Sequence, residues 1–146
     1  MWLALDVDRW PKTNLRSVCK DAKKRGFGLA ISNPCFELWL YLHISENDLE
    51  GDEFQALINR EKGKSKAMVA RLRERLADRG GYQKANLHFD VFRPGVHEAI
   101  TRAQVMDVSP GELWPSVWPR TRVYRLVEKT LALLQRDSEF SWRGRS

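Results

Sequence analysis

The sequence has few cysteines and no long apolar run. Its 146 residues include only Cys19 and Cys35, which form neither a C-x-x-C pair nor a disulfide framework. Two reduced thiols are typical of a cytoplasmic protein, and we expect that location. The longest apolar stretch, Phe36 to Ile44, contains Glu37 and His43 and is far shorter than the roughly 20 residues of a membrane-spanning helix. We therefore expect no membrane segment.

Several other signals are also missing from the sequence. The opening residues MWLALDVD have no basic leader and turn acidic after residue 5, so we expect no signal peptide. No G-x-x-x-x-G-K-[ST] phosphate loop is present, and the three histidines lack the spacing of zinc ligands. There is no internal repeat. From the missing phosphate loop and zinc-ligand spacing we expect neither a P-loop protein nor a zinc-binding one.

The composition is that of a folded domain. Hydrophobic residues make up 42% of the chain and include six tryptophans, which is enough to build a core. The length fits one domain. We expect this single domain to span residues 1–137, followed by a frayed tail over residues 138–146.

Apolar periodicity predicts an α/β fold. A short buried strand over 2–5, a helix beginning near Asn14 as its N-cap, and a second strand over 27–31 form a βαβ unit with parallel strands. The remaining chain is predicted to be mostly helical. Ser32-Asn33-Pro34 is expected to cap a buried helix over 36–44. Further helices are predicted over 54–60, 65–78, 96–105 and 121–136.

The positive charge is concentrated in one segment. The net charge is +6, and residues 60–79 hold eight Lys or Arg against three acidic residues, or +5 of that total. A basic segment of this kind attracts polyanions by electrostatic steering and counterion release. The alternative is a solvated helix face. The candidate nucleic-acid contacts are Lys62, Lys64, Lys66, Arg71, Arg73 and Arg75.

Asp6 and Asp8 follow the first predicted strand. If both lie on the strand, residues i and i+2 point to the same side, so the two carboxylates share one face. The carboxyl ends of parallel strands are where open α/β sheets bind ligands. Two carboxylates held together favour a hard divalent cation, Mg²⁺ or Mn²⁺. The alternative is that one aspartate caps a turn and the other is solvated.

Glu37 and His43 lie on the predicted apolar helix. Glu37 is either stabilised by the positive end of the helix dipole or costly to bury, and a buried acid is a candidate for catalysis. His43 lies about 120° round the helix from Glu37, so the two side chains need not meet one ligand. For His43, the alternative is a core histidine with its hydrogen bonds satisfied.

Two further sets of residues have weaker signals. Cys35 has no histidine at a spacing that suggests a nucleophilic thiol. Tyr82 and Lys84 are either phosphate contacts or ordinary surface residues.

The order of motifs resembles the RloB-like family. The motifs are LALDVD, ISNPCFELWLYLHI, YQK, EAITRA and RTRVYRLVEKTLAL, and the resemblance covers about residues 1–134. It implies a Toprim-like domain from prokaryotic restriction or phage-defence loci, with a parallel α/β sheet that binds Mg²⁺ and supports strand cleavage. By the same resemblance, Asp6 and Asp8 match the D-x-D metal motif. Glu37 and His43 match the family's FE-x-W and downstream histidine positions.

The resemblance departs from the Toprim pattern at the N-terminus. Toprim-like proteins carry a glutamate in an E-G motif on a strand upstream of D-x-D, whereas here D-x-D begins at residue 6. We therefore expect a partial parallel sheet with an exposed edge. Such an edge invites pairing with a second copy or a partner subunit.

Two functions follow from the sequence. The first is a divalent-metal-dependent nuclease of a phage-defence system, or a shortened or inactive relative, acting on DNA or RNA with Asp6 and Asp8 as metal ligands and Glu37 and His43 as catalytic residues. The alternative is a non-catalytic module that binds nucleic acid or a partner through the basic segment 60–79.

Overall fold

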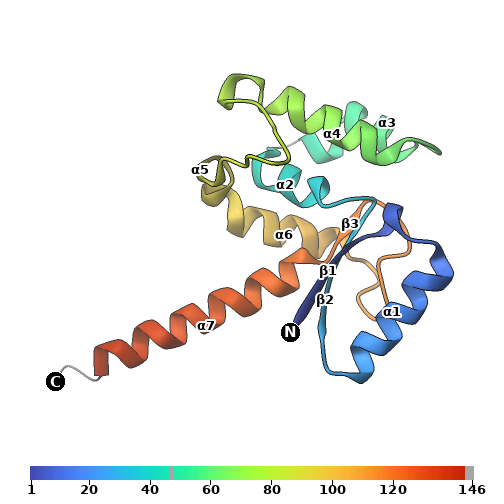
Figure 1. The fold of residues 1–146 in the computed structure, drawn as a ribbon. Coiled ribbons are helices and arrows are strands. Elements are labelled where there is room, and N and C mark those ends of the chain that lie inside the picture. The colour runs from blue at the N-terminus through green and yellow to red at the C-terminus, as the bar shows by residue number, and fades with distance from the viewer. Residues whose placement is uncertain (47, 144–146) are drawn as a thin grey trace.

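The computed structural model describes the backbone of residues 1–46 and 48–143, and the side chains of these residues except 48, 53 and 137–143. It shows an α/β fold, with a small sheet near the N-terminus followed by a mostly helical C-terminal part (Figure 1). This confirms the predicted fold class.

The sheet has three strands in the order β1-β2-β3. β1 (Trp2–Asp6) pairs in parallel with β2 (Gly28–Asn33), with Asp6 opposite Ser32. The short β3 (Arg120–Thr121) is antiparallel to the end of β2, so the sheet is mixed, and the sequence pattern missed this strand. Among the described residues, β1 pairs only with β2, so β1 is an edge strand.

Seven helices accompany the sheet in the described part of the chain. They are α1 (Lys12–Lys24), α2 (Glu37–Ile44), α3 (Asp52–Ile58), α4 (Lys64–Arg75), α5 (Phe89–Phe92), α6 (Val96–Met106) and α7 (Val123–Arg143). Short 3₁₀ turns occur at Val7–Arg9, Asp48–Glu50, Ala77–Arg79 and Arg93–Gly95. Over the same residues, none of the helices combines the length and apolar character needed to cross a membrane.

Side-chain alternation along β2 divides the core into two parts. Ile31 packs with Leu15 and Cys19 of α1 on one face of the sheet. Ala30 points to the opposite face and joins the larger cluster that includes the helices of the C-terminal part. The strands thus lie between α1 on one side and the helical part on the other (Figure 1).

The predicted βαβ unit is confirmed, but its predicted helix caps are not. α1 begins at Lys12 with Pro11 at the N-cap, so Asn14 lies inside the helix. Ser32 and Asn33 belong to β2 and do not cap α2, which begins at Glu37 with Phe36 as its N-cap. The Ser32 hydroxyl lies 2.8 Å from that of Thr121, and the Asn33 amide donates to the Pro115 carbonyl oxygen at 2.9 Å. These two side chains therefore stabilise contacts with a distant segment.

α2 is buried almost all round, as its apolar sequence predicted. All of its residues except His43 are buried, including Glu37 with 2% of its surface exposed. α4 and α6 pack against it. The helix is therefore an internal element, and its first residue faces the carboxyl end of the sheet.

A buried ion pair joins the C-terminal part of the chain to the sheet. The backbone N–H of Arg122 donates to the Ile31 carbonyl oxygen at 2.8 Å, and the Arg122 guanidinium donates to both oxygens of Asp107 at 3.1–3.2 Å. It also donates to the carbonyl oxygens of Ser109 and Glu112, each at 2.6 Å. All of these contacts tie the 107–119 loop to the end of the sheet.

α7 differs from its predicted bounds at both ends. Thr121 lies in β3, and the helix continues past residue 136 to Arg143. In Figure 1 it extends away from the sheet and the other helices. The remainder of the predicted frayed tail, residues 144–146, lies outside the described residues.

Removal of the Asp107 carboxylate is expected to destabilise the fold strongly. Asp107→Ala leaves the guanidinium of Arg122, whose side chain is 2% exposed, buried without its counter-ion. We expect a loss of about 3–5 kcal/mol in the free energy of unfolding, measured by urea denaturation. Asp90→Ala removes an exposed pair with Arg93 and serves as the control, with an expected loss below about 1 kcal/mol. Equal effects of the two variants would contradict this account.

Candidate functional site

Three acidic residues lie at the carboxyl ends of the two parallel strands. Asp6 is the last residue of β1, Asp8 lies in the turn that follows, and Glu37 begins the helix that follows β2. The backbone N–H of Asp8 donates to the Pro34 carbonyl oxygen at 3.2 Å, which joins the segments that leave the two strands. Asp6, Asp8 and Glu37 are called the carboxylate cluster below.

The expected reason for the proximity of Asp6 and Asp8 is only partly right. β1 ends at Asp6, and Asp8 occupies the 3₁₀ turn Val7–Arg9, so the alternation of side chains along a strand does not place both residues. The turn nevertheless brings the Asp8 carboxylate close enough to act electrostatically on Asp6. The hydroxyl of Ser65, near the start of α4, donates a hydrogen bond to Oδ2 of Asp8.

The pKa of Asp6 is affected by its burial and by the other two carboxylates of the cluster. Burial raises this pKa above its ordinary value, and the negative charges of Asp8 and Glu37 raise it further. The opposing effects are a backbone hydrogen bond from Phe36 and the positive charge of Lys84. An added cation would relieve the repulsion within the cluster.

Glu37 is buried but remains ionised. Burial raises its pKa, but hydrogen bonds from the Tyr82 hydroxyl, its own backbone N–H and the Cys35 thiol outweigh burial, with help from the charge of Lys84, and its pKa is lowered. The Tyr82 hydroxyl donates to Oε1 of Glu37 at 2.8 Å, and Nζ of Lys84 lies 3.3 Å from the same oxygen. The side chain is therefore held as a carboxylate, with an exposed lysine as its counter-ion.

Cys35 acts at this site as a hydrogen-bond donor. Burial raises the pKa of its thiol to about 12, and the charge of Glu37 adds to this effect. A thiol with so high a pKa stays protonated at neutral pH, which agrees with the lack of a nucleophile signal in the sequence.

The donor set of the carboxylate cluster suits a hard divalent cation. Carboxylate oxygens are the ligands preferred by Mg²⁺, which commonly binds one or two protein carboxylates and completes its shell with water and phosphate oxygens. In the described part of the chain, no group of three or more His, Cys, Asp or Glu side chains is close enough to hold a metal. A cation at Asp6 and Asp8 would therefore have two protein carboxylates as ligands and would depend on water or phosphate oxygens for the rest of its shell.

His43 does not join the carboxylate cluster. Its Nδ1 lies 2.8 Å from the Phe92 carbonyl oxygen, and its ring packs edge-to-face against Trp39 with centroids 4.8 Å apart. Burial lowers the pKa of His43, so the ring is neutral at pH 7. The structure places it half-buried between α2 and α5, with its ring also edge-to-face against Phe92.

The six basic residues selected from the sequence lie in or next to α4 but not on one face. Lys62 precedes the helix, and the Lys64 ammonium lies 5.0 Å from the centre of a Trp118 ring. Arg71 forms an ion pair with Glu74 at 2.9 Å. Lys66, Arg73 and Arg75 are exposed. This arrangement provides scattered positive charge near Ser65, which contacts the carboxylate cluster.

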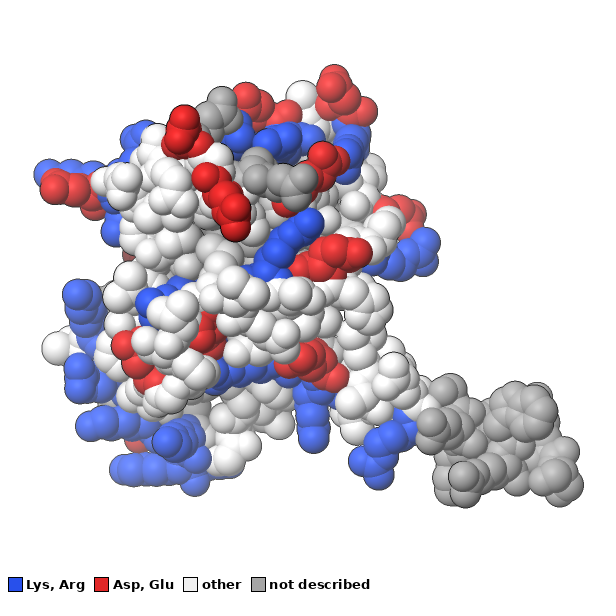
Figure 2. All heavy atoms as spheres, turned by 180° about the vertical axis from the view of Figure 1, so that it is seen from behind, with Lys and Arg blue, Asp and Glu red and all other residues white. Residues whose placement is uncertain are grey.

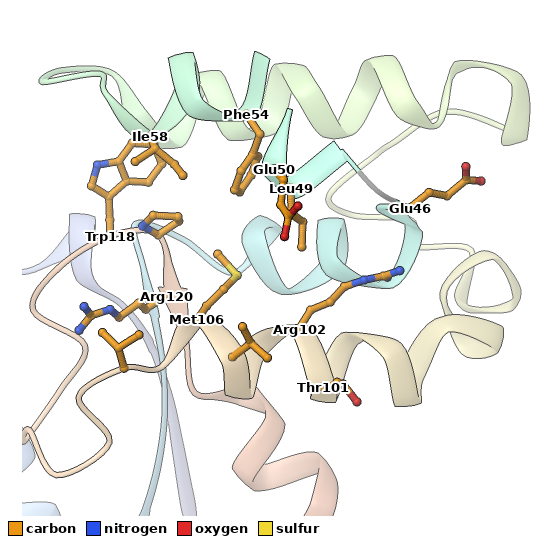
Figure 3. Close-up of a pocket in the computed structure, with 13 residues that line it drawn as sticks. Glu46, Leu49, Glu50, Phe54, Ile58, Thr101, Arg102, Met106, Trp118 and Arg120 are labelled. Atoms are coloured by element: carbon orange, nitrogen blue, oxygen red, sulfur yellow. The ribbon is translucent and has the colours of Figure 1, made fainter. Parts of the chain in front are cut away.

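A cavity of about 630 Å³ is lined by residues of α3, α6 and the segment 118–120 (Figure 3). Its apolar lining includes Phe54 and Ile58 of α3, Met106 of α6, and Trp118. Arg102 also lines it, and the guanidinium of Arg102 donates to the Leu42 carbonyl oxygen at 2.6 Å. None of the three clustered carboxylates lines this cavity, so the cavity and the carboxylate cluster are separate features of the molecule.

The sequence pattern understated the importance of Ser65, Tyr82 and Lys84. The Tyr82-x-Lys84 pair was left open between phosphate contacts and surface residues, whereas both side chains contact Glu37. Ser65 was expected only as the beginning of a helix. One feature of the sequence could have drawn attention to these residues. Ser65 closely follows Gly63, and Tyr82 and Lys84 closely follow Gly80-Gly81, so all three are polar residues just after a glycine-containing turn.

Comparison with known proteins identifies one family. A family model described as RloB-like protein matches residues 1–130. No curated protein and no solved structure matches the chain.

The hydrogen bond from Tyr82 to Glu37 leads us to expect that the stability of the fold depends on pH. Because the pKa of Glu37 is lowered from 4.5 in the folded state, its ionisation stabilises the fold above that pH, and this contribution is lost as the pH falls through the lowered pKa. Tyr82→Phe removes a hydrogen bond to a charged group, so we expect a loss of about 1.5–3 kcal/mol in the free energy of unfolding at neutral pH.

The difference between wild type and Tyr82→Phe should shrink when urea denaturation is repeated at a pH below the lowered pKa of Glu37, because Glu37 is then protonated. In a Glu37→Gln background, Tyr82→Phe should show no such dependence on pH. A stability difference that is the same at both pH values in the wild-type background would contradict the assignment.

Proposed function

The chain belongs to the RloB-like family, and from this membership together with its carboxylate cluster we propose that it is a divalent-metal-dependent enzyme that hydrolyses nucleic-acid phosphodiester bonds. The observation that carries the proposal is the convergence of Asp6, Asp8 and Glu37 at the carboxyl ends of parallel strands. By the family resemblance, its biological setting is prokaryotic phage defence. A cytoplasmic location fits the two free, buried thiols, Cys19 and Cys35.

Each residue of the cluster has a distinct role in this proposal. Asp6 and Asp8 hold Mg²⁺ or Mn²⁺, and Ser65 fixes the orientation of the Asp8 carboxylate by its hydrogen bond. A divalent cation bound there supplies Lewis-acid polarisation of a phosphoryl oxygen and lowers the pKa of bound water. Glu37, kept charged by Tyr82 and Cys35, accepts a hydrogen bond from the attacking water and orients it.

Lys84 supplies positive charge beside the same cluster. Its ammonium lies 3.3 Å from Glu37, while the side chain is 67% exposed and has room to turn toward a phosphate. In this proposal, Lys84 stabilises negative charge on the phosphoryl oxygens, and the basic residues of 60–79 hold the backbone on either side of the cleaved bond. His43 is given no part in this proposal, because its side chain contacts Phe92 and Trp39 and does not contact the carboxylate cluster.

The second candidate is a non-catalytic module that binds nucleic acid or a partner subunit. Three observations favour it. Lys84 already neutralises Glu37, and no ready-made three-ligand metal group occurs in the parts of the chain that the structure covers. The open edge of β1 offers a place for a partner strand. This candidate predicts binding that is sensitive to salt and indifferent to Mg²⁺.

Metal binding separates the two candidates. We expect Mn²⁺ to bind the wild-type protein in isothermal titration calorimetry and to lose this binding in Asp6→Asn/Asp8→Asn, while circular dichroism shows that the variant remains folded. Asp90→Asn, at an exposed position, is the control and should bind Mn²⁺ as the wild type does. Failure of a folded wild type to bind Mn²⁺ would favour the non-catalytic module.

Cleavage of labelled DNA and RNA tests the role of Glu37. We expect the wild type to cleave one of these substrates with Mg²⁺ or Mn²⁺, and Glu37→Gln to reduce the rate by about 10²-fold or more while Mn²⁺ binding persists. Unchanged cleavage by Glu37→Gln would remove this residue from the mechanism.

A further inference from the structure

α1 and the residue after it form a second strongly basic segment. Residues 12–25 contain six Lys or Arg and a single acid, Asp21, so this segment has the same formal charge of +5 as residues 60–79. All six basic side chains are exposed. Lys and Arg side chains gather at the lower left of Figure 2, in the part of the molecule that α1 occupies.

Five of these side chains lie along one side of the helix. At about 100° per residue, positions i, i+4, i+8, i+11 and i+12 fall within an arc of about 120°. The residues at these positions, called the α1 stripe, are Lys12, Arg16, Lys20, Lys23 and Lys24. The buried residues Leu15, Cys19 and Ala22 form a neighbouring stripe that packs on the sheet, so the α1 stripe faces solvent.

The charges of the α1 stripe are not neutralised within the described part of the chain. None of its five side chains forms an ion pair there, and Arg16 is held over the ring of Trp114 at 5.3 Å from the ring centre. In α4, by contrast, Arg71 is paired with Glu74. The α1 stripe is thus the more regular and the less compensated of the two basic surfaces.

The position of α1 connects the stripe to the carboxylate cluster. The helix begins three residues after the turn that holds Asp8, so its N-terminal end lies at the same edge of the sheet as the cluster. Thirteen residues of α-helix span about 20 Å, the length of about six phosphates along one strand of nucleic acid.

We propose that the α1 stripe binds the sugar-phosphate backbone of the nucleic acid whose cleaved bond lies at the carboxylate cluster. The inference rests on the proposed function and adds to it the surface that positions the substrate. A membrane surface fits less well, because the apolar face of α1 is buried against the sheet and leaves nothing to insert between lipids.

Neutralisation of the stripe tests the proposal. The variant Lys12→Gln/Lys20→Gln/Lys23→Gln removes three charges and leaves the Arg16–Trp114 contact in place. The control Arg93→Gln/Lys129→Gln/Arg136→Gln removes three charges from the 93–95 turn and α7, so the two variants have the same net charge. Circular dichroism checks that both are folded. Binding to fluorescein-labelled 20-nucleotide DNA and RNA, single-stranded and duplex, is measured by anisotropy over a range of salt concentrations, without divalent cations.

For the α1 variant, we expect at least a tenfold loss of affinity at about 0.1 M salt. The slope of log K against log salt concentration should become shallower by about 2–3, because three phosphate contacts are lost. The control should change the affinity less than threefold. An α1 variant that binds as the wild type does would overturn this inference and leave the proposed function standing.

Two other results have different meanings. A wild type that binds none of the nucleic acids would contradict the proposed function itself, and this inference with it. Binding of the wild type to vesicles containing anionic phosphatidylserine, lost in the α1 variant and accompanied by no nucleic-acid binding, would overturn the inference in favour of a lipid surface.

Discussion

The buried pair of Arg122 and Asp107 is the constraint on which the rest of the arrangement depends. The pair and its partners join three parts of the chain, because Arg122 also reaches the Ile31 carbonyl oxygen through its backbone and the Ser109 and Glu112 carbonyl oxygens through its guanidinium. A charge that is 2% exposed is costly to bury without partners, and here each of the three guanidinium nitrogens has at least one. The 107–119 loop and the start of α7 are therefore fixed to the end of β2, the strand from which the chain leads to the carboxylate cluster.

A second buried charge, Glu37, defines the chemistry available at the sheet edge. A carboxylate with 2% exposure would ordinarily become protonated, but hydrogen bonds from Tyr82 and Cys35 keep its pKa low. The same negative charge raises the pKa of Asp6, so the site combines a stabilised carboxylate with a destabilised one. This concentration of negative charge attracts cations, and the Lys84 ammonium neutralises part of it at one oxygen of Glu37. A divalent ion at Asp6 and Asp8 would neutralise more of it.

Local patterns in the sequence predicted the parts of the fold that depend on local interactions. The strand-helix-strand unit was confirmed because apolar periodicity determines which face of each element turns inward. The burial of α2 was confirmed because its sequence is apolar on nearly every side. The caps assigned to Asn14, Ser32 and Asn33 were wrong. The polar atoms of Ser32 and Asn33 contact residues more than 80 positions away. Helix-capping rules consider only neighbouring residues and therefore cannot predict such contacts. The contact of Tyr82 with Glu37 escaped prediction for the same reason, since 45 positions separate the two.

The distribution of positive charge shows why a count of basic residues along the sequence does not identify the more regular basic surface. Residues 12–25 and 60–79 carry equal formal charge, yet the count drew attention to the second segment because it has more basic residues. In the structure, Met68 and Leu72 lie on the buried face of α4, and the basic residues of this helix are spread over several of its other faces. In α1, the apolar stripe and the basic stripe lie side by side along the helix. Because the apolar stripe is buried against the sheet, the basic side chains form one row that faces solvent. Alignment determines how many phosphates a helix can contact at once, and each contact releases a counterion, so a regular stripe binds a backbone more tightly than equal charge spread round a helix.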